Sequence, residues 1–141
     1  MEKTLTNPKR GDIWLVDFDP TRPDEVGKTR PALIIQDNDI DVGTIVVIPF
    51  STVIVPDSEP LRVHYSGLSF LDHPSDLAIT QIRSLSLKRF HKKLGSMPSS
   101  EMPKISQYIG LVLGLKQWIH SQKAASCKWM KNAVFLHLFF P

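Results

Sequence analysis

Short runs rich in β-branched and aromatic residues, separated by clusters of turn-forming residues, occupy most of the first 90 positions of the chain. Runs of this length and composition are typical of β-strands. Apolar and polar residues alternate in a strand that buries one face, and a strand that buries both faces is continuously apolar. Pro49 should restrict its run to an edge, a bulge or a strand end. Five or six strands of this kind predict a mainly β fold, either a small barrel or a sandwich. They are expected at residues 13–19 (IWLVDFD), 31–36 (PALIIQ), 44–50 (TIVVIPF), 61–65, 77–82 and 85–87.

The pattern changes to helical spacing after Gly95. Ser99 or Ser100 is expected to cap a helix that tolerates Pro103 in its first turn. Few charges interrupt the apolar stripe, so this helix should pack against the sheet. It is predicted to extend to about His120, with its stripe formed by Ile105, Tyr108, Ile109, Val112, Leu113, Leu115, Trp118 and Ile119. Gly110 and Gly114 lie on one side of it, where packing accommodation is the simplest interpretation.

Length and composition limit the class of protein. A chain of 141 residues favours a single domain, and its one cysteine, Cys127, leaves no partner for an intrachain disulfide. No apolar run approaches the roughly 20 residues of a membrane span. The first residues, MEKTLTNPKRGD, contain no apolar stretch typical of a secretory signal, so a cytoplasmic protein is expected.

Charge is distributed unevenly along the chain. The formal net charge is +3, yet residues 1–76 contain 7 basic and 13 acidic side chains, and residues 77–122 contain 7 basic and one acidic. Residues 83–93 (RSLSLKRFHKK) contain five cations and no acid. Such a run is either a solvated face or a surface that contacts phosphate.

Three segments together resemble the MazF/PemK toxin family. They are residues 10–36 (RGDIWLVDFDPTRPDEVGKTRPALIIQ), 46–52 (VVIPFST) and 80–90 (TQIRSLSLKRF), in the order and spacing of that family. The resemblance assigns residues 1–122 to the toxin domain and leaves 123–141 as an atypical apolar and basic extension. It implies an SH3-like barrel of five to seven short strands with a C-terminal helix, usually a homodimer. It also implies a ribosome-independent endoribonuclease that cuts single-stranded RNA and is held inactive by a cognate antitoxin.

Candidate catalytic residues follow from this resemblance and from the chemistry of RNA. The substrate carries its own nucleophile, the 2′-hydroxyl, so no cofactor or metal is expected. Arg30 matches the arginine of the family's Arg-Pro pair, and a guanidinium binds phosphate bidentately. Ser51 matches a hydroxyl position after the third strand, with Thr52 as its alternative. Glu25 matches an acidic position that can act as a base or orient Arg30.

Candidate RNA-binding residues lie in these three segments and in the basic run at 83–93. The set consists of Lys28, Thr52, Gln81, Arg83, Lys92 and Lys93. Gln81 and Arg83 are separated by one residue, so a continuous strand would place both on one face. Phe90 is either a base-stacking platform or a core residue, whereas Trp14 is expected in the core or an interface.

Other interpretations remain open at the level of the sequence. Arg30 could pair with Asp24 or Glu25 to fix its loop, and Ser51 could satisfy a local backbone group. This sequence departs from the family pattern at two positions. Val26 stands where glutamine is frequent in the family, and Thr80 stands where some members have an acid. The alternative functions are a noncatalytic toxin that binds a protein target, as gyrase-poisoning relatives do, and a decayed member that binds RNA or antitoxin without cutting.

Overall fold

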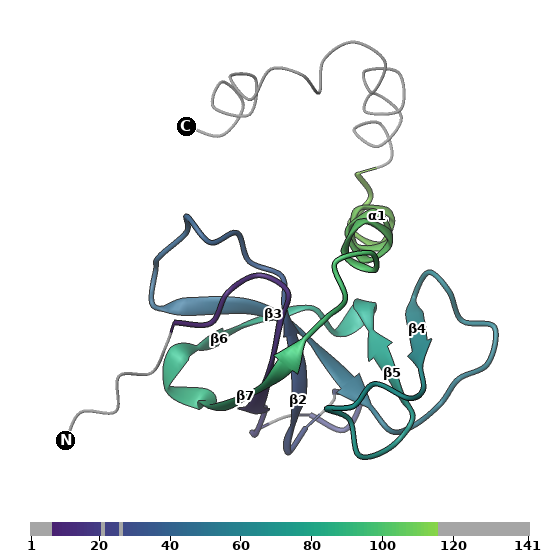
Figure 1. Cartoon of the computed structure of the whole chain (residues 1–141), viewed down its shortest axis with the longest axis horizontal. Coiled ribbons are helices and arrows are strands. Elements are labelled where there is room, and N and C mark those ends of the chain that lie inside the picture. Colours follow the sequence, from purple (N-terminus) through teal and green to yellow (C-terminus); the bar gives the residue numbers. More distant parts are fainter. Residues whose placement is uncertain (1–6, 21, 26, 116–141) are drawn as a thin grey trace, which may run out of the picture.

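The computed structural model describes residues 7–20, 22–25 and 27–115 of the chain. These residues form seven strands, two 3₁₀ turns and one helix (Figure 1). The strands are β1 (Asp12–Asp17), β2 (Thr29–Ile34), β3 (Thr44–Ser51), β4 (Arg62–Tyr65), β5 (Ser75–Ala78), β6 (Arg83–Ser86) and β7 (Phe90–Ser96). The 3₁₀ turns are η1 (Ile79–Gln81) and η2 (Leu87–Arg89), and the helix is α1 (Met102–Val112). The predicted mainly β fold with a C-terminal helix is confirmed, while the predicted extension at 123–141 lies outside the described residues.

The seven strands form one antiparallel sheet in the order β4-β5-β3-β2-β1-β7, with β6 as a further neighbour of β3. Strand β3 is the longest and borders three other strands. Along one side it pairs with β2. Along its other side, Thr44–Val47 pair with β6, and Phe50 and Ser51 pair with β5.

Pro49 lies within β3 and not at the edge of the sheet. It stands opposite Ala32 of β2, but neither Ile48 nor Pro49 has a registered partner on the side that faces β5 and β6. A proline removes one backbone donor, and a gap in the pairing is where a sheet tolerates that loss. The sequence predicts an edge, a bulge or a strand end for Pro49. The structure places it inside β3, where that strand changes its partner from β6 to β5.

The two faces of the sheet bury separate apolar clusters. One cluster includes Leu33, Phe50 and Leu77 and is covered by Ile105 of α1. The second cluster consists of Trp14, Val16, Phe18, Ala32, Ile34, Ile45, Val47, Leu85 and Phe90. Neighbouring positions of β2 alternate between the clusters, which explains why its sequence is continuously apolar. The rings of Trp14 and Phe90 meet edge to face at 6.3 Å, so Phe90 is a core residue and not an exposed stacking platform.

Strand β7 is not expected from the sequence. Its residues His91, Lys92 and Lys93 are exposed, and the run lacks the apolar alternation that identifies a half-buried strand. It pairs with β1, at one end of the strand order, where lysines are common because they discourage further strand pairing. Gly95 is required in β7, because a Cβ there would lie 2.6 Å from the ring of Phe70.

The single strand predicted at residues 77–82 is wrong in its second half. Strand β5 ends at Ala78, and the chain then turns through η1, which contains Gln81. Arg83 begins a different strand, β6, which pairs with the other half of β3. The argument from strand alternation therefore does not apply to Gln81 and Arg83.

Helix α1 begins later and ends earlier than its sequence predicts. Neither Ser99 nor Ser100 is its cap; Glu101 precedes it, with its carboxylate accepting a hydrogen bond of 2.8 Å from the Tyr65 hydroxyl. Pro103 lies in the first turn, as predicted. None of the helical segments among the described residues is long and apolar enough to cross a membrane.

Gly114 ends the helix by adopting a left-handed conformation with φ of +77°. Its N–H bonds to the Leu111 carbonyl at 3.2 Å, and the Leu115 N–H bonds to the Gly110 carbonyl at 2.8 Å. This pair of bonds is the Schellman arrangement, in which glycine is favoured because it lacks a Cβ. The predicted continuation to His120 is therefore interrupted at Leu113, and residues 116–120 lie outside the described part of the chain.

Replacement of Gly114 by alanine is expected to lower the free energy of unfolding by about 1–2 kcal/mol. The space around the new Cβ is open, so the effect arises from backbone strain alone. Urea unfolding followed by circular dichroism measures it. Gln107→Ala, on the exposed surface of the same helix, is the control and should change stability by less than about 0.5 kcal/mol. Equal effects of the two substitutions would contradict the capping role.

Candidate active site

Arg30 and Ser51 stand at neighbouring strand ends on one face of the sheet. Strands β2 and β3 pair with Ala32 opposite Pro49, and Arg30 and Ser51 each lie two residues beyond that pair, at the start of β2 and the end of β3. Directly opposite residues of an antiparallel pair share a face. Ala32 belongs to the second cluster, so Arg30 and Ser51 lie at the border of that cluster, on the face opposite α1. The structure thus places the two strongest catalytic predictions on one face of the sheet.

The guanidinium of Arg30 is held by the loop that precedes β2. Its Nε donates a hydrogen bond of 2.6 Å to the Gly27 carbonyl. Burial lowers the pKa of Arg30 and the charge of Asp19 partly offsets this, and the group stays protonated at neutral pH. Neither Asp24 nor Glu25, both described, forms an ion pair with Arg30, so the nearby acid is Asp19. Among contacts between the described residues, this is the hydrogen bond that the Arg30 side chain makes.

The β1–β2 loop is organised by its own carboxylates. Asp19 accepts a hydrogen bond of 2.8 Å from the Lys28 N–H, and Lys28 takes a left-handed conformation with φ of +65°. Glu25 accepts a bond of 3.1 Å from the Arg22 N–H. Glu25 and Lys28 are both exposed, on the loop that leads to Arg30. Their predicted roles as base and phosphate contact stay predictions.

Ser51 is buried, whereas Thr52 is exposed. The Ser51 Oγ accepts a hydrogen bond of 3.2 Å from the Val53 N–H. A hydroxyl that accepts at one lone pair keeps its own proton for donation. Ser51 therefore satisfies a local backbone group and is also able to donate to a phosphate oxygen, so the two interpretations of this residue are compatible.

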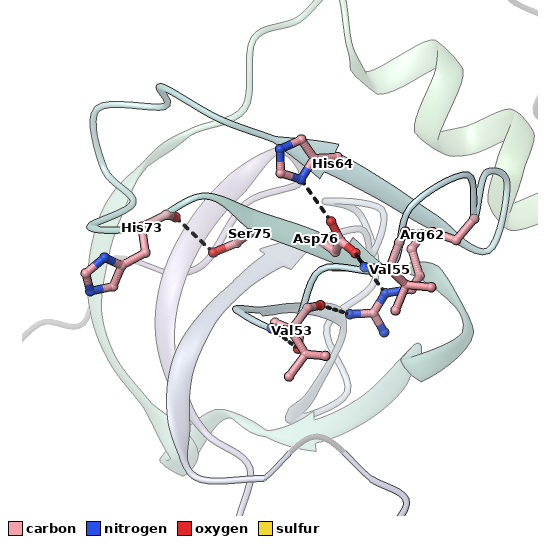
Figure 2. A network of polar contacts seen from close by, with 9 residues as sticks. Val53, Val55, Arg62, His64, His73, Ser75 and Asp76 are labelled. Atoms are coloured by element: carbon pink, nitrogen blue, oxygen red, sulfur yellow. Dashed lines mark hydrogen bonds and ion pairs between the residues drawn. The ribbon is translucent and has the colours of Figure 1, made fainter.

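A buried carboxylate, which the sequence did not single out, continues the same row of residues. Asp76 of β5 stands opposite Ser51, and His64 of β4 stands opposite Asp76. The side chain of Asp76 is 1% exposed and contacts Arg62, His64 and the backbone of Val55 (Figure 2). One sequence signal was available, because alternation along the predicted strand 61–65 places Arg62 and His64 on one face.

The ionisation of Asp76 follows from these donors. Burial raises its pKa, but the hydrogen bonds from the Val55 N–H, Arg62 and His64 outweigh burial, and the pKa is lowered overall. A carboxylate in this setting is charged at neutral pH and fully hydrogen-bonded. The absence of any unpaired buried polar side-chain atom among the described residues agrees with this.

A pocket of about 670 Å³ adjoins this carboxylate. It is lined by Ile54, Val55, Pro56, Asp57, Ser58, Glu59, Arg62 and His64. Neither Arg30 nor Ser51 lines it, so the pocket lies beside the predicted catalytic pair and not over it. Among the described residues, no group of three or more His, Cys, Asp or Glu side chains is placed to hold a metal ion.

The predicted RNA-binding residues divide between two faces. Arg83 stands opposite Val47 of the second cluster, and its guanidinium lies 5.7 Å from the centre of the Phe18 ring, so it shares a face with Arg30. Lys92 stands opposite Leu15, which in turn stands opposite Pro31. Leu15 lies between Trp14 and Val16 of the second cluster, so alternation puts Leu15 and Lys92 on the opposite face from Arg30.

Two further members of that predicted set have partners within the fold. Lys93 forms an ion pair of 2.9 Å with Asp12. Gln81 lies in η1 and is also engaged in an interaction. The basic run at 83–93 is thus not one continuous surface.

The fold and this face define a small mainly β protein with two arginines and a strand-end hydroxyl suited to a phosphate group. Residues 9–113 match the family model described as PemK-like, MazF-like toxin of type II toxin-antitoxin system. Endoribonuclease MazF of Staphylococcus epidermidis is 31% identical in an alignment 118 residues long that covers 79% of this chain and 96% of that protein. The chain belongs to the PemK/MazF toxin family, which confirms the resemblance found in its sequence.

Solved structures of similar fold agree with that assignment. An endoribonuclease in complex with its cognate antitoxin from a mycobacterial species has a TM-score of 0.63 at 21% identity, over 77% of this chain and 97% of that one. MazF from Deinococcus radiodurans has a TM-score of 0.63 at 22% identity, over 76% of this chain and 96% of that one. At these identities the structures support the fold.

The lowered pKa of Asp76 predicts acid-dependent stability. A folded-state pKa below the unfolded value stabilises the protein above about pH 4, and this contribution is lost as the pH falls through the folded-state pKa. Asp76→Asn should lower the free energy of unfolding by about 1–3 kcal/mol at pH 7 and by less at pH 3. Urea unfolding between pH 3 and 7 measures this. The exposed Asp72→Asn is the control, and a difference for Asp76→Asn that did not vary with pH would refute the assignment.

Proposed function

We propose that this chain is an endoribonuclease that cleaves single-stranded RNA and acts as the toxin of a toxin–antitoxin pair. The observation that carries the proposal is that strand alternation places Arg30, near the start of β2, and Ser51, at the end of β3, on the face that also holds Arg83. Membership of the PemK/MazF family and the name of the staphylococcal relative, Endoribonuclease MazF, support the reaction class.

In the proposed reaction the 2′-hydroxyl oxygen attacks the neighbouring phosphorus. Its proton passes to a base, the bond from phosphorus to the 5′-oxygen breaks, and that oxygen takes up a proton as it leaves. The products are a 2′,3′-cyclic phosphate and a 5′-hydroxyl end. Proton transfers of this kind contribute about 10²–10⁴-fold to the rate.

Each predicted catalytic residue has a role in that scheme. Arg30 stabilises the negative charge that develops on the phosphate oxygens, because a guanidinium is charged, planar and able to donate two parallel bonds. Ser51 donates its hydroxyl proton to a phosphate oxygen. Glu25 is the candidate base, on the exposed loop that leads to Arg30. Thr80 stands where some members of the family have an acid, so Glu25 supplies the one carboxylate of this scheme.

The proposed partners follow from the same function. Single-stranded RNA is the substrate, and a cognate antitoxin protein is the inhibitor, a pairing supported by the mycobacterial endoribonuclease that is bound to its own antitoxin. We further propose a homodimer, the usual state implied by the family resemblance, and a cytoplasmic site of action where messenger RNA is found. Lys28, Thr52 and Gln81 are the remaining RNA-contact proposals.

Purified protein incubated with a long single-stranded RNA in EDTA is expected to produce new 5′-hydroxyl ends at preferred sites. Arg30→Ala should slow this cleavage by about 10²–10³-fold, because it removes a preorganised donor to the transition state. Arg22→Ala, an exposed arginine of the same loop, is the matched control and should retain activity. Primer extension maps the ends. No cleavage, or equal rates for Arg30→Ala and the wild type, would favour a binding toxin or a decayed member.

The division of the basic residues between two faces predicts unequal contributions to RNA binding. Arg83→Gln should weaken binding and reduce the slope of log K against log[salt] by about 0.7, the value for one phosphate contact on a single strand. Lys92→Gln should leave the slope unchanged, because its register places it on the opposite face from Arg30. Fluorescence anisotropy with an RNA that carries 2′-deoxy at the cleavage site measures both. A larger effect of Lys92→Gln would restore the basic run as the binding surface.

A further inference from the structure

A buried carboxylate of β5 helps to attach the loop between β3 and β4, residues 52–61, to the sheet. Asp76 Oδ2 accepts hydrogen bonds from the Val55 N–H at 2.9 Å and from Arg62 Nε at 3.1 Å. Arg62 Nη2 in turn donates to the Val53 carbonyl at 2.7 Å. The His64 ring, half exposed, places Nδ1 3.1 Å from Asp76 Oδ1. Figure 2 shows Asp76 at the centre of these contacts, with Val53 and Val55 on the loop side.

This network reaches Ser51 through one residue of the loop. The Val53 N–H donates to Ser51 Oγ at 3.2 Å, while the Val53 carbonyl is held by Arg62. Both backbone polar groups of Val53 are therefore bound, one to Ser51 and one to the arginine that Asp76 holds. With one lone pair of Oγ occupied by that N–H, the hydroxyl of Ser51 keeps its proton for donation to another acceptor.

A carboxylate is an unexpected choice for a buried position in a strand. Its neighbours in β5 are Ser75 and Leu77, both of them buried, and neither carries a charge. Burial of a charged group is unfavourable unless donors surround it, and Asp76 has three of them. Those donors are the loop backbone, Arg62 and His64. The carboxylate therefore holds the loop and does not serve to fill the core.

We propose that Asp76 is a positioning residue that acts through Arg62, Val55 and Val53 to hold the hydroxyl of Ser51 in the orientation that donates to the scissile phosphate. This role rests on the proposed function of Ser51 in RNA cleavage. Asp76 stands opposite Ser51 in the sheet, and this pairing sets the distance between the two side chains that the loop contacts must span. Arg62 supplies the bridge, because its planar head donates to the carboxylate and to the Val53 carbonyl at once.

The test compares three substitutions by single-turnover and steady-state RNA cleavage. Asp76→Ala removes all acceptors and should lower kcat by about 10- to 100-fold, with KM changed by less than about threefold. Asp76→Asn should recover most of kcat, because its amide oxygen can accept from Val55 and Arg62 while the His64 ring accepts from its NH₂. Asp72→Asn, the exposed control, should retain wild-type kcat.

A double-mutant cycle separates positioning from a general loss of structure. In a Ser51→Ala background, Asp76→Ala should lower the residual rate by less than about twofold, because the residue through which it acts is gone. Amide hydrogen exchange should show faster exchange at Val53 and Val55 in Asp76→Ala, with the protection of β1 and β2 retained. If Asp76→Ala fails to fold, Arg62→Ala takes its place, since Arg62 lies partly exposed at the surface and carries the link to Val53.

The outcomes are distinct. A loss of kcat of the same size with and without Ser51 would overturn the positioning role and leave the proposed function intact. Unchanged kcat in Asp76→Ala with faster exchange in the loop would overturn it as well. Absence of cleavage by the wild-type protein would overturn the proposed function and this role together.

Discussion

Strand β3 borders three other strands, and the position of the candidate site depends on that arrangement. Its first half pairs with β6 and its second half with β5, while β2 runs along its other side. The last residue of β3, Ser51, pairs with Asp76 of β5. Arg30 lies near the start of β2, and strand alternation puts it on the same face. A strand that changes partners along its length thus helps to place a cation, a hydroxyl and a carboxylate on one face of the sheet.

Charge is organised by the faces of this sheet and not by the order of the sequence. The acidic first half of the chain contains Arg30, and the basic stretch that follows contributes Arg83 to the same face. Arg83 lies over Phe18, where an aromatic face supports a guanidinium without neutralising it. The lysines of β7 belong to a strand at one end of the sheet, and one of them already pairs with Asp12. The formal excess of +3 is therefore a poor guide to where phosphate would bind.

The sequence predicts the elements whose side chains alternate or are continuously apolar, and it fails where burial is incomplete. Strands β1, β2 and β3 are identified because burial on one or both faces leaves a clear pattern. Strand β7 is not predicted because its lysines face solvent. The end of α1 is misplaced because the apolar stripe continues past Gly114, whose backbone conformation outweighs the pattern. Arg30 and Ser51 are found through motif resemblance, while Asp76 belongs to no motif and gains its meaning only from strand register.

The buried carboxylate shows why register carries information that residue identity does not. Arg62 and His64 alternate on a four-residue strand, and their shared face becomes significant only when β5 sets Asp76 between them. An apolar residue at position 76 would bury more easily, as its neighbour Leu77 does. The carboxylate instead holds a loop whose backbone has no other anchor to β5 among the described contacts. Since that loop also bonds to Ser51, selection for the orientation of one hydroxyl explains a charge that packing alone would not favour.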